Sequence, residues 1–315
     1  MLLLAYAVVA SLVVYASIKA SCYIDMIDRT TKLSGAFLGG VLLSAVTSLP
    51  ELFTSLSATV FLDKPELCIG NILGSDLFNI AMLSVVMLFC IRSAGRMAIA
   101  RGNILVACYL VAIYGIMLLD YKGIIDFGIG GINIITFLFI GIYALAVRHL
   151  SEGNAEPSEC AAEEVSLSPK AIAVRFIIAS IAIIALSIVL TYITDDIATE
   201  YSLGKGLAGA LFLGVATSLP EVSSTIALFR IKNYDIAVGN IVGSNLFNFL
   251  VLCIADIIGF RSSVYVYDDA KIVGLLVFGA VAALITLPLL TVRNKWVRIV
   301  CGAGIAACYV AFLVS

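Results

Sequence analysis

Two glutamates, Glu51 and Glu221, each close the same five-residue motif, which reads TSLPE at 47–51 and again at 217–221. The motif threonine stands four residues before its glutamate, so on a helix the hydroxyl and the carboxylate share one face. The motif proline has no N–H group, which leaves one main-chain carbonyl oxygen without its helical partner. Carboxylate, hydroxyl and carbonyl oxygens are hard ligands that suit Ca²⁺ and Na⁺ better than soft metals. The residue types alone therefore indicate a cation site that includes Thr47, Glu51, Thr217 and Glu221.

A second motif is also present twice, as GNILGSDLFN at 70–79 and as GNIVGSNLFN at 239–248. The offset is 169 residues (70 to 239), against 170 for the first motif (47 to 217), which indicates an internal duplication. In each copy a serine and an asparagine lie four residues apart, so one helix face can offer a hydroxyl and an amide oxygen. The alternative is that these side chains bridge helices by hydrogen bonds, and the motif glycines are predicted close-packing positions. The residues concerned are Ser75 and Asn79 in the first copy and Ser244 and Asn248 in the second.

Asp76 breaks the symmetry of the repeat, because its counterpart is Asn245. On a helix it points about 100° away from Ser75, its neighbour in the chain. Two interpretations stay open for it: a secondary ion or proton site, and a protonated residue that packs between helices.

The elements that must position these residues are membrane helices. Of the 315 residues, 62% are hydrophobic and only 13% are charged, with a mean hydropathy of +1.12, so lipid must surround most of the chain. A helix needs about 20 apolar residues to cross a bilayer. Ten stretches qualify, at 2–19, 34–62, 67–91, 102–119, 126–147, 171–193, 206–229, 236–258, 272–292 and 298–314.

Three carboxylates, Glu51, Asp76 and Glu221, are predicted to lie well inside these spans. A charged side chain at that depth costs at least about 2.5–3.5 kcal/mol, so each is a functional candidate. A protonated, hydrogen-bonded glutamate that holds helices together is the alternative for the two motif positions.

The predicted architecture is an all-α integral membrane protein of ten transmembrane helices in two inverted five-helix repeats. The repeats cover 1–150 and 170–315, and an acidic linker at 151–169 joins them. Five spans is an odd number, so the second copy must enter the membrane from the opposite side, an arrangement typical of transporters. Fourteen of the 19 Lys and Arg residues fall in the loops after the odd-numbered spans, which places the linker in the cytoplasm and both termini outside the cell.

With these motifs in hand, the chain resembles the sodium/calcium exchanger family of the cation/Ca²⁺ exchanger superfamily, in its prokaryotic form. The resemblance covers essentially the whole chain, and it implies a central Ca²⁺ held by Glu51, Glu221, Thr47 and Thr217. It implies flanking Na⁺ sites built from Ser48, Ser75, Asn79, Ser218, Ser244 and Asn248. It also implies that the first and sixth spans slide across a rigid remainder. Asn248 departs from relatives that carry Asp there, which leaves the ion stoichiometry and any K⁺ dependence open.

The function expected on these grounds is secondary active exchange of Ca²⁺ for Na⁺ by alternating access. An H⁺/Ca²⁺ antiporter of the same fold is the first alternative, and a cation channel is a second. An enzyme is not expected, because the predicted spans contain no histidine and no paired-aspartate motif. Besides the transported ions, no cofactor is expected, and neither nucleic acid nor an obligatory protein partner is expected. The net charge of −2 is not informative about nucleic-acid or acidic partners.

Overall fold

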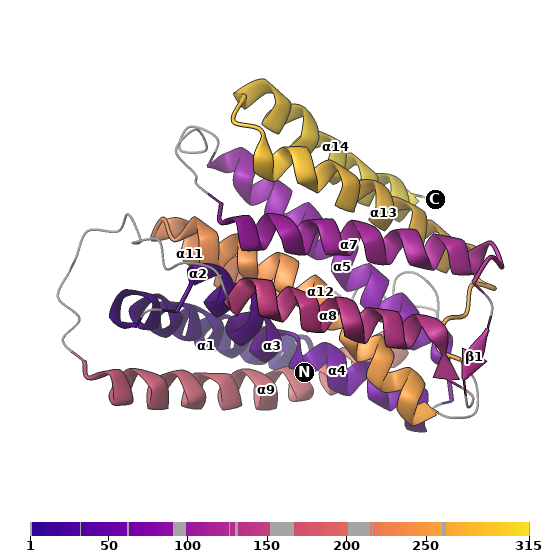
Figure 1. The fold of residues 1–315 in the computed structure, drawn as a ribbon. Helices are drawn as coiled ribbons and strands as arrows, with labels where there is room; N and C mark the ends of the chain where they lie inside the picture. The colour runs from indigo at the N-terminus through magenta and orange to yellow at the C-terminus, as the bar shows by residue number, and fades with distance from the viewer. Residues whose placement is uncertain are drawn as a thin grey trace.

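The computed structural model describes residues 2–31, 33–61, 63–90, 99–125, 127–129, 132–151, 167–200, 215, 217–259 and 263–314, and these are mostly helical (Figure 1). The long helices are α1 (Leu2–Thr30), α5 (Pro65–Phe89), α7 (Arg101–Tyr121), α8 (Ile134–Ser151), α9 (Pro169–Glu200), α11 (Leu219–Arg230), α12 (Tyr234–Gly259), α13 (Ala270–Thr291) and α14 (Lys295–Val314). Shorter pieces follow α1, namely α2 (Gly35–Phe37), η1 (Leu38–Leu43), α3 (Ser44–Thr47), α4 (Leu49–Leu56) and η2 (Ser57–Phe61). A hairpin of β1 (Gly128–Ile129) and β2 (Ile132–Asn133) precedes α8.

Nine of the ten predicted spans have a counterpart among the described residues. Eight helices are long and apolar enough to cross a membrane, and Gly35–Thr47 with Leu49–Val60 forms a ninth span that is bent by 42°. The remaining predicted span, 206–229, contains α11, but its first half lies outside the described residues. An all-α, multi-pass membrane fold is thus confirmed, and the full set of ten helices in two inverted repeats stays a prediction.

Three predicted boundaries are wrong, and one of them is the end of the sixth span, which was expected at residue 193, whereas α9 continues to Glu200. The first span was expected to end at residue 19, but α1 continues to Thr30. The additional turns of α1 contain charged residues. Two of these compensate each other, because Arg29 forms a salt bridge with Asp25 at 2.8 Å. The fifth span was expected to begin at 126, but α8 begins at Ile134 because the hairpin occupies the preceding residues.

The loops that the span count assigns to one membrane face meet at one end of the helix bundle. Hydrogen bonds join the loop after α1 to the end of α8, the start of α7 to the start of α12, and the start of α12 to the end of α1. These bonds run from Ser34 to the Leu150 carbonyl (2.8 Å), from the Ala100 main-chain nitrogen to Asp235 (2.8 Å), and from Asn233 to Asp25 (2.7 Å). Their position at one end agrees with an even number of chain crossings between any two of these loops.

At the opposite end of the bundle, the buried carboxylate of Asp256 in α12 accepts three hydrogen bonds. It accepts hydrogen bonds from the Thr136 hydroxyl at 2.7 Å, from the Asn133 main-chain nitrogen at 3.1 Å and from the Val264 main-chain nitrogen at 3.3 Å. Asp256 is only 1% exposed, yet the sequence did not single it out, because it stands two residues from the end of a predicted span. It fastens the hairpin and the loop after α12 to the helices.

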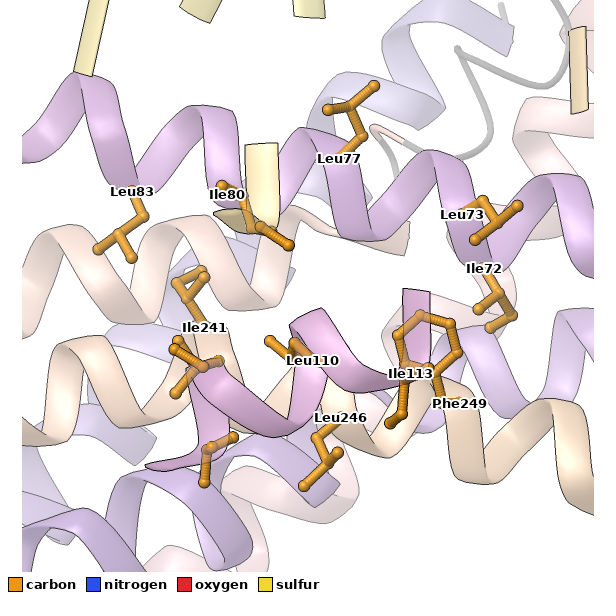
Figure 2. Close-up of a cluster of buried hydrophobic side chains, with 14 of the residues drawn as sticks. Ile72, Leu73, Leu77, Ile80, Leu83, Leu110, Ile113, Ile241, Leu246 and Phe249 are labelled. Atoms are coloured by element: carbon orange, nitrogen blue, oxygen red, sulfur yellow. The ribbon is translucent and has the colours of Figure 1, made fainter. Parts of the chain in front are cut away.

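Helices α5 and α12 run through the centre of the bundle, with α1 and α9 side by side along one edge and α13 and α14 along the other (Figure 1). Apolar side chains of α5, α7 and α12 interdigitate there (Figure 2). They include Ile72, Leu73, Leu77, Ile80, Leu83, Leu110, Ile113, Ile241, Leu246 and Phe249, none more than 2% exposed. Close packing of this kind is what holds helices together in lipid, where burial of apolar surface gives no driving force.

Helix α12 touches η1 backbone to backbone. A Cβ atom on Gly243 would overlap the carbonyl oxygen of Gly40, and one on Gly239 would lie 3.0 Å from the Gly40 nitrogen. The predicted close-packing role of the glycines in the second motif copy is thus confirmed.

The first-copy glycines, Gly70 and Gly74, have no neighbour within 4 Å of a built Cβ among the described residues. By the repeat, their partner would be 209–210, the counterpart of Gly39 and Gly40, which lies outside the described part of the chain. Their predicted packing role stays a prediction.

Candidate functional site

Both TSLPE motifs interrupt a helix at their serine. Ser48 separates α3 from α4 with φ −92° and ψ 7°, and Ser218 precedes α11 with nearly the same angles, φ −85° and ψ 3°. In each motif the proline occupies the first turn of the new helix, where its missing N–H is tolerated. The helix therefore restarts within the motif, and the glutamate lies in the first turn of α4 or α11. That position also favours a negative charge, because the N-terminus of a helix carries partial positive charge.

The two motifs bind each other across the centre of the molecule. The Ser48 hydroxyl donates to Glu221 Oε1 at 2.9 Å, and the Ser218 hydroxyl donates to Glu51 Oε1 at 3.3 Å. All four side chains are 0% exposed. Each glutamate is thus held by the serine of the other motif rather than by its own.

The motif threonines follow the same crossed pattern. Thr217 lies near the Glu51 carboxylate, and Thr47 lies near that of Glu221. Thr47 also contacts the Ser244 hydroxyl of α12 at 3.4 Å. The i, i+4 spacing predicted that each threonine would accompany the glutamate of its own motif, whereas each threonine lies near the glutamate of the other.

Asn240, the second residue of the GNIVGSNLFN motif, is a site residue that the sequence reasoning missed. Its amide nitrogen donates to the Glu221 carbonyl at 3.2 Å and to the Thr225 hydroxyl at 3.1 Å. Its amide oxygen accepts from Thr47 at 3.4 Å. The counterpart Asn71 donates to Ser55 at 3.2 Å, so both copies of this asparagine support the helix that carries a motif glutamate. Their recurrence in both motif copies was the available signal.

Beside the glutamates, α5 and α12 meet through a chain of polar side chains. Asn79 donates to Asn245 Oδ1 at 3.1 Å, and Asn245 donates to the Asp76 carbonyl at 2.9 Å. Asn248 donates to Asp76 Oδ1 at 2.8 Å. Asp76 therefore faces α12, and the structure joins it to Asn79 and Asn248, two of the predicted ligands.

The site contains buried oxygen atoms that have no hydrogen-bond partner among the described residues. They are Glu51 Oε2, Glu221 Oε2, Ser75 Oγ, Asp76 Oδ2, Asn79 Oδ1 and Asn248 Oδ1. No Lys, Arg or His side chain in the described part of the chain pairs with the three carboxylates. Unpaired buried oxygens and charges are costly, and a bound cation removes that cost. The donor set is all oxygen, as hard cations require.

The geometry also says how such an ion would be held. Among the described residues no three Asp, Glu, His or Cys side chains converge on one point, so acidic groups alone cannot complete a coordination shell. Ca²⁺ takes about 6–8 oxygen ligands, and the hydroxyl and amide oxygens that surround the glutamates can supply the rest. Every predicted ligand is at most 1% exposed, so the site is buried inside the molecule.

Comparison with known proteins gives a consistent result. Residues 1–150 and 171–315 match the family model described as sodium/calcium exchanger protein. The inner membrane protein YrbG of Escherichia coli is 26% identical over 250 residues, 76% of this chain and 74% of its own length. CaxA of Alkalimonas amylolytica, described as a candidate antiporter, is 26% identical over 232 residues, 72% of this chain and 70% of its own. A structure of the sodium-calcium exchanger NCX_Mj, soaked with 10 mM Na⁺ and zero Ca²⁺, superposes with a TM-score of 0.73 at 20% identity, over 100% of this chain and 99% of the other.

Proposed function

This chain belongs to the sodium/calcium exchanger family and is a Ca²⁺/Na⁺ antiporter, and from that premise we propose that Glu51 and Glu221 form the site that carries both ions in turn. The observation that carries the proposal is the crossed pairing of the two motifs, with Ser48 on Glu221 and Ser218 on Glu51. The pairing brings one carboxylate from each repeat to the same buried place. Two negative charges there match one Ca²⁺.

Ca²⁺ would bind between the two glutamates, through the oxygens that are unpartnered in the described structure, Glu51 Oε2 and Glu221 Oε2. Thr47 and Thr217 would add neutral oxygens, since they lie near the two carboxylates. A dehydrated Ca²⁺ in this position replaces the lost interactions of both buried charges with water.

Na⁺ would bind the same carboxylates together with serine and asparagine oxygens. These oxygens lie at the helix interruptions in the two TSLPE motifs and on α5 and α12. These are Ser48, Ser75, Asn79, Ser218, Ser244 and Asn248. Because Na⁺ and Ca²⁺ would share the glutamates, the two loads exclude each other. Shared ligands turn the site into an exchanger rather than a co-transporter.

Exchange would be obligatory for an electrostatic reason. An empty site would leave two uncompensated carboxylates in a medium of low dielectric constant, where each buried charge costs several kcal/mol. The empty protein is therefore not expected to change between outward-open and inward-open states, and only an ion-loaded protein does so. A channel would lack this requirement.

The orientation and the partners follow the same proposal. The linker at 151–169 would lie in the cytoplasm and both termini outside the cell, because most Lys and Arg residues fall on the linker's side of the membrane. The transported ions would be the only small molecules that the cycle needs, without a cofactor and without an obligatory protein partner.

Flux of ⁴⁵Ca²⁺ into proteoliposomes under an imposed Na⁺ gradient, at constant pH and clamped membrane potential, tests the proposal. The natural protein should accumulate Ca²⁺, and Glu51→Gln and Glu221→Gln should each abolish accumulation while the purified variants keep their size-exclusion profile. Near-normal flux in either variant would refute the assignment of the site. Flux that follows a pH gradient and ignores Na⁺ would instead identify H⁺ as the counter-ion, and flux that needs no counter-ion would identify a channel.

A further inference from the structure

Asp76 is a fully buried carboxylate for which the exchange between two glutamates gives no role. It lies on α5 and is 0% exposed. Its Oδ1 atom accepts one hydrogen bond, from the Asn248 amide at 2.8 Å, and its Oδ2 atom has no partner among the described residues. A buried ion with one hydrogen bond and no counter-charge is strongly disfavoured. Something besides the side chains described here must compensate Asp76.

The sequence repeat shows what is unusual about this position. Asn79 donates to Oδ1 of Asn245 at 3.1 Å, and its repeat counterpart Asn248 donates to Oδ1 of Asp76, the counterpart of Asn245. The two halves thus make the same bond. They differ at the second terminal atom, where Asn245 has an amide nitrogen that donates to the Asp76 carbonyl at 2.9 Å and Asp76 has an oxygen without a partner. At this position the first half therefore carries a carboxylate where the second half has a neutral amide that donates a hydrogen bond.

Further free oxygens lie around that charge. The Asn248 amide that bonds to Asp76 leaves its own Oδ1 atom without a partner, within the same short side chain. Tyr114 of α7 is 1% exposed, and its hydroxyl has no partner among the described residues. Its ring lies against α12 one residue after Asn248. Phe249 packs edge-on against the Tyr114 ring at 5.4 Å between centroids, which limits where the hydroxyl can turn. One carboxylate with neutral amide and phenol oxygens has the charge and the hardness to bind a monovalent cation.

We propose that Asp76 is a third acidic ligand of the transport site, and that with Asn248 and Tyr114 it binds one Na⁺ in each cycle beyond those that the glutamate pair requires. The inference rests on the proposed function and adds to it the residue that sets the number of Na⁺ ions per Ca²⁺. Asp76 does not converge with both glutamates on a single point, so its ion occupies a place of its own.

The coupling ratio tests this without depending on the transport rate. In proteoliposomes at zero membrane potential, net Ca²⁺ flux stops when the Ca²⁺ ratio across the membrane equals the Na⁺ ratio raised to the number of Na⁺ ions exchanged. Asp76→Asn should lower that exponent by one. The double variant Asp76→Asn with Asn245→Asp moves the charge to the repeat-related position, and it should restore the exponent. Tyr114→Phe, which keeps every charge, should leave the exponent unchanged and weaken the apparent Na⁺ affinity.

Each outcome separates this inference from the proposed function. If the natural protein shows no Na⁺-driven Ca²⁺ flux, the proposed function fails. If it shows such flux and Asp76→Asn exchanges with an unchanged exponent, only the Asp76 ligand is refuted, and Asp76 is then a neutral packing residue. If Asp76→Asn does not fold, Tyr114→Phe decides: a weaker apparent Na⁺ affinity with an unchanged exponent supports the proposal, and an unchanged Na⁺ affinity overturns it.

Discussion

The Ser48 hydroxyl donates a hydrogen bond to the Glu221 carboxylate at 2.9 Å, although 173 residues separate them, and Ser218 makes the corresponding bond to Glu51. Neither motif is complete without the other. The serine of each helix break stabilises the charge on the opposite glutamate, because a hydrogen bond to an ionised group is stronger than one between neutral groups. The arrangement makes the two repeats one site.

Removing one of these crossed bonds should weaken ion binding. A hydrogen bond to a charged group contributes about 1.5–3 kcal/mol, so Ser48→Ala should lower the apparent Na⁺ affinity roughly 10- to 100-fold. Titration of Na⁺-dependent ⁴⁵Ca²⁺ flux measures this. Ser223→Ala is the matched control, because the Ser223 hydroxyl bonds to the Leu219 carbonyl of its own helix at 2.7 Å. Equal affinities in the two variants would count against a direct role of Ser48.

The contact between Gly243 and Gly40 should make the first of these glycines intolerant of any side chain. Gly243→Ala places a methyl group into main-chain atoms of η1, which cannot turn aside as a side chain could. Overpacking typically costs about 1–3 kcal/mol, and we expect a cost at or above that range. Thermal unfolding in detergent measures it, with Gly141→Ala as control, since nothing described lies within 4 Å of a Cβ there. A Gly243→Ala protein as stable as this control would contradict the packing described.

Asp256 should stabilise the end of the bundle through its acceptor oxygens. Asp256→Asn exchanges one acceptor oxygen for a donor that would face the Thr136 hydroxyl or a main-chain N–H group. The expected loss of stability is about 1.5–3 kcal/mol. Asp269→Asn is a suitable comparison, because Asp269 caps α13 through the Lys271 nitrogen at 2.8 Å and asparagine caps helices about as well. Indistinguishable melting temperatures for the two variants would rule out this anchoring role.

The orientation can be tested through a native cysteine. Cys160 stands in the linker at 151–169, which we place in the cytoplasm. A membrane-impermeant maleimide should therefore label it in inverted vesicles and not in intact cells. Cys160→Ser identifies the signal against the other seven cysteines. Labelling from outside intact cells would reverse the proposed topology.

The sequence was sufficient for most of the helices and for most of the residues that the structure brings together around Glu51 and Glu221. Repetition identified both motifs, and the lack of charge identified nine spans that the structure describes. The loops tied together by Ser34 and Asn233 are loops that the span count assigned to one face. These features are local or periodic, so a single chain reveals them.

The sequence could not give the pairing between repeats. The spacing of Thr47 and Glu51 predicts a shared helix face, but which residue of the other half meets that face depends on how α4 and α11 pack. The same limit applied to Asn240, whose amide links Thr47 to Glu221. The extension of α1 was missed because charged residues do not end a helix when neighbouring groups compensate them. The later start of α8 was missed because the apolar residues of the hairpin were counted as part of the span.

The bonds at the end of the bundle where Asn233 reaches Asp25 have a consequence for how the chain could be divided. They join the two halves directly, as does the backbone contact of Gly243 with Gly40, and neither uses the linker. Segments 1–150 and 170–315 made as separate polypeptides in one membrane would still find these contacts. The covalent connection would then serve mainly to raise the local concentration of one half near the other.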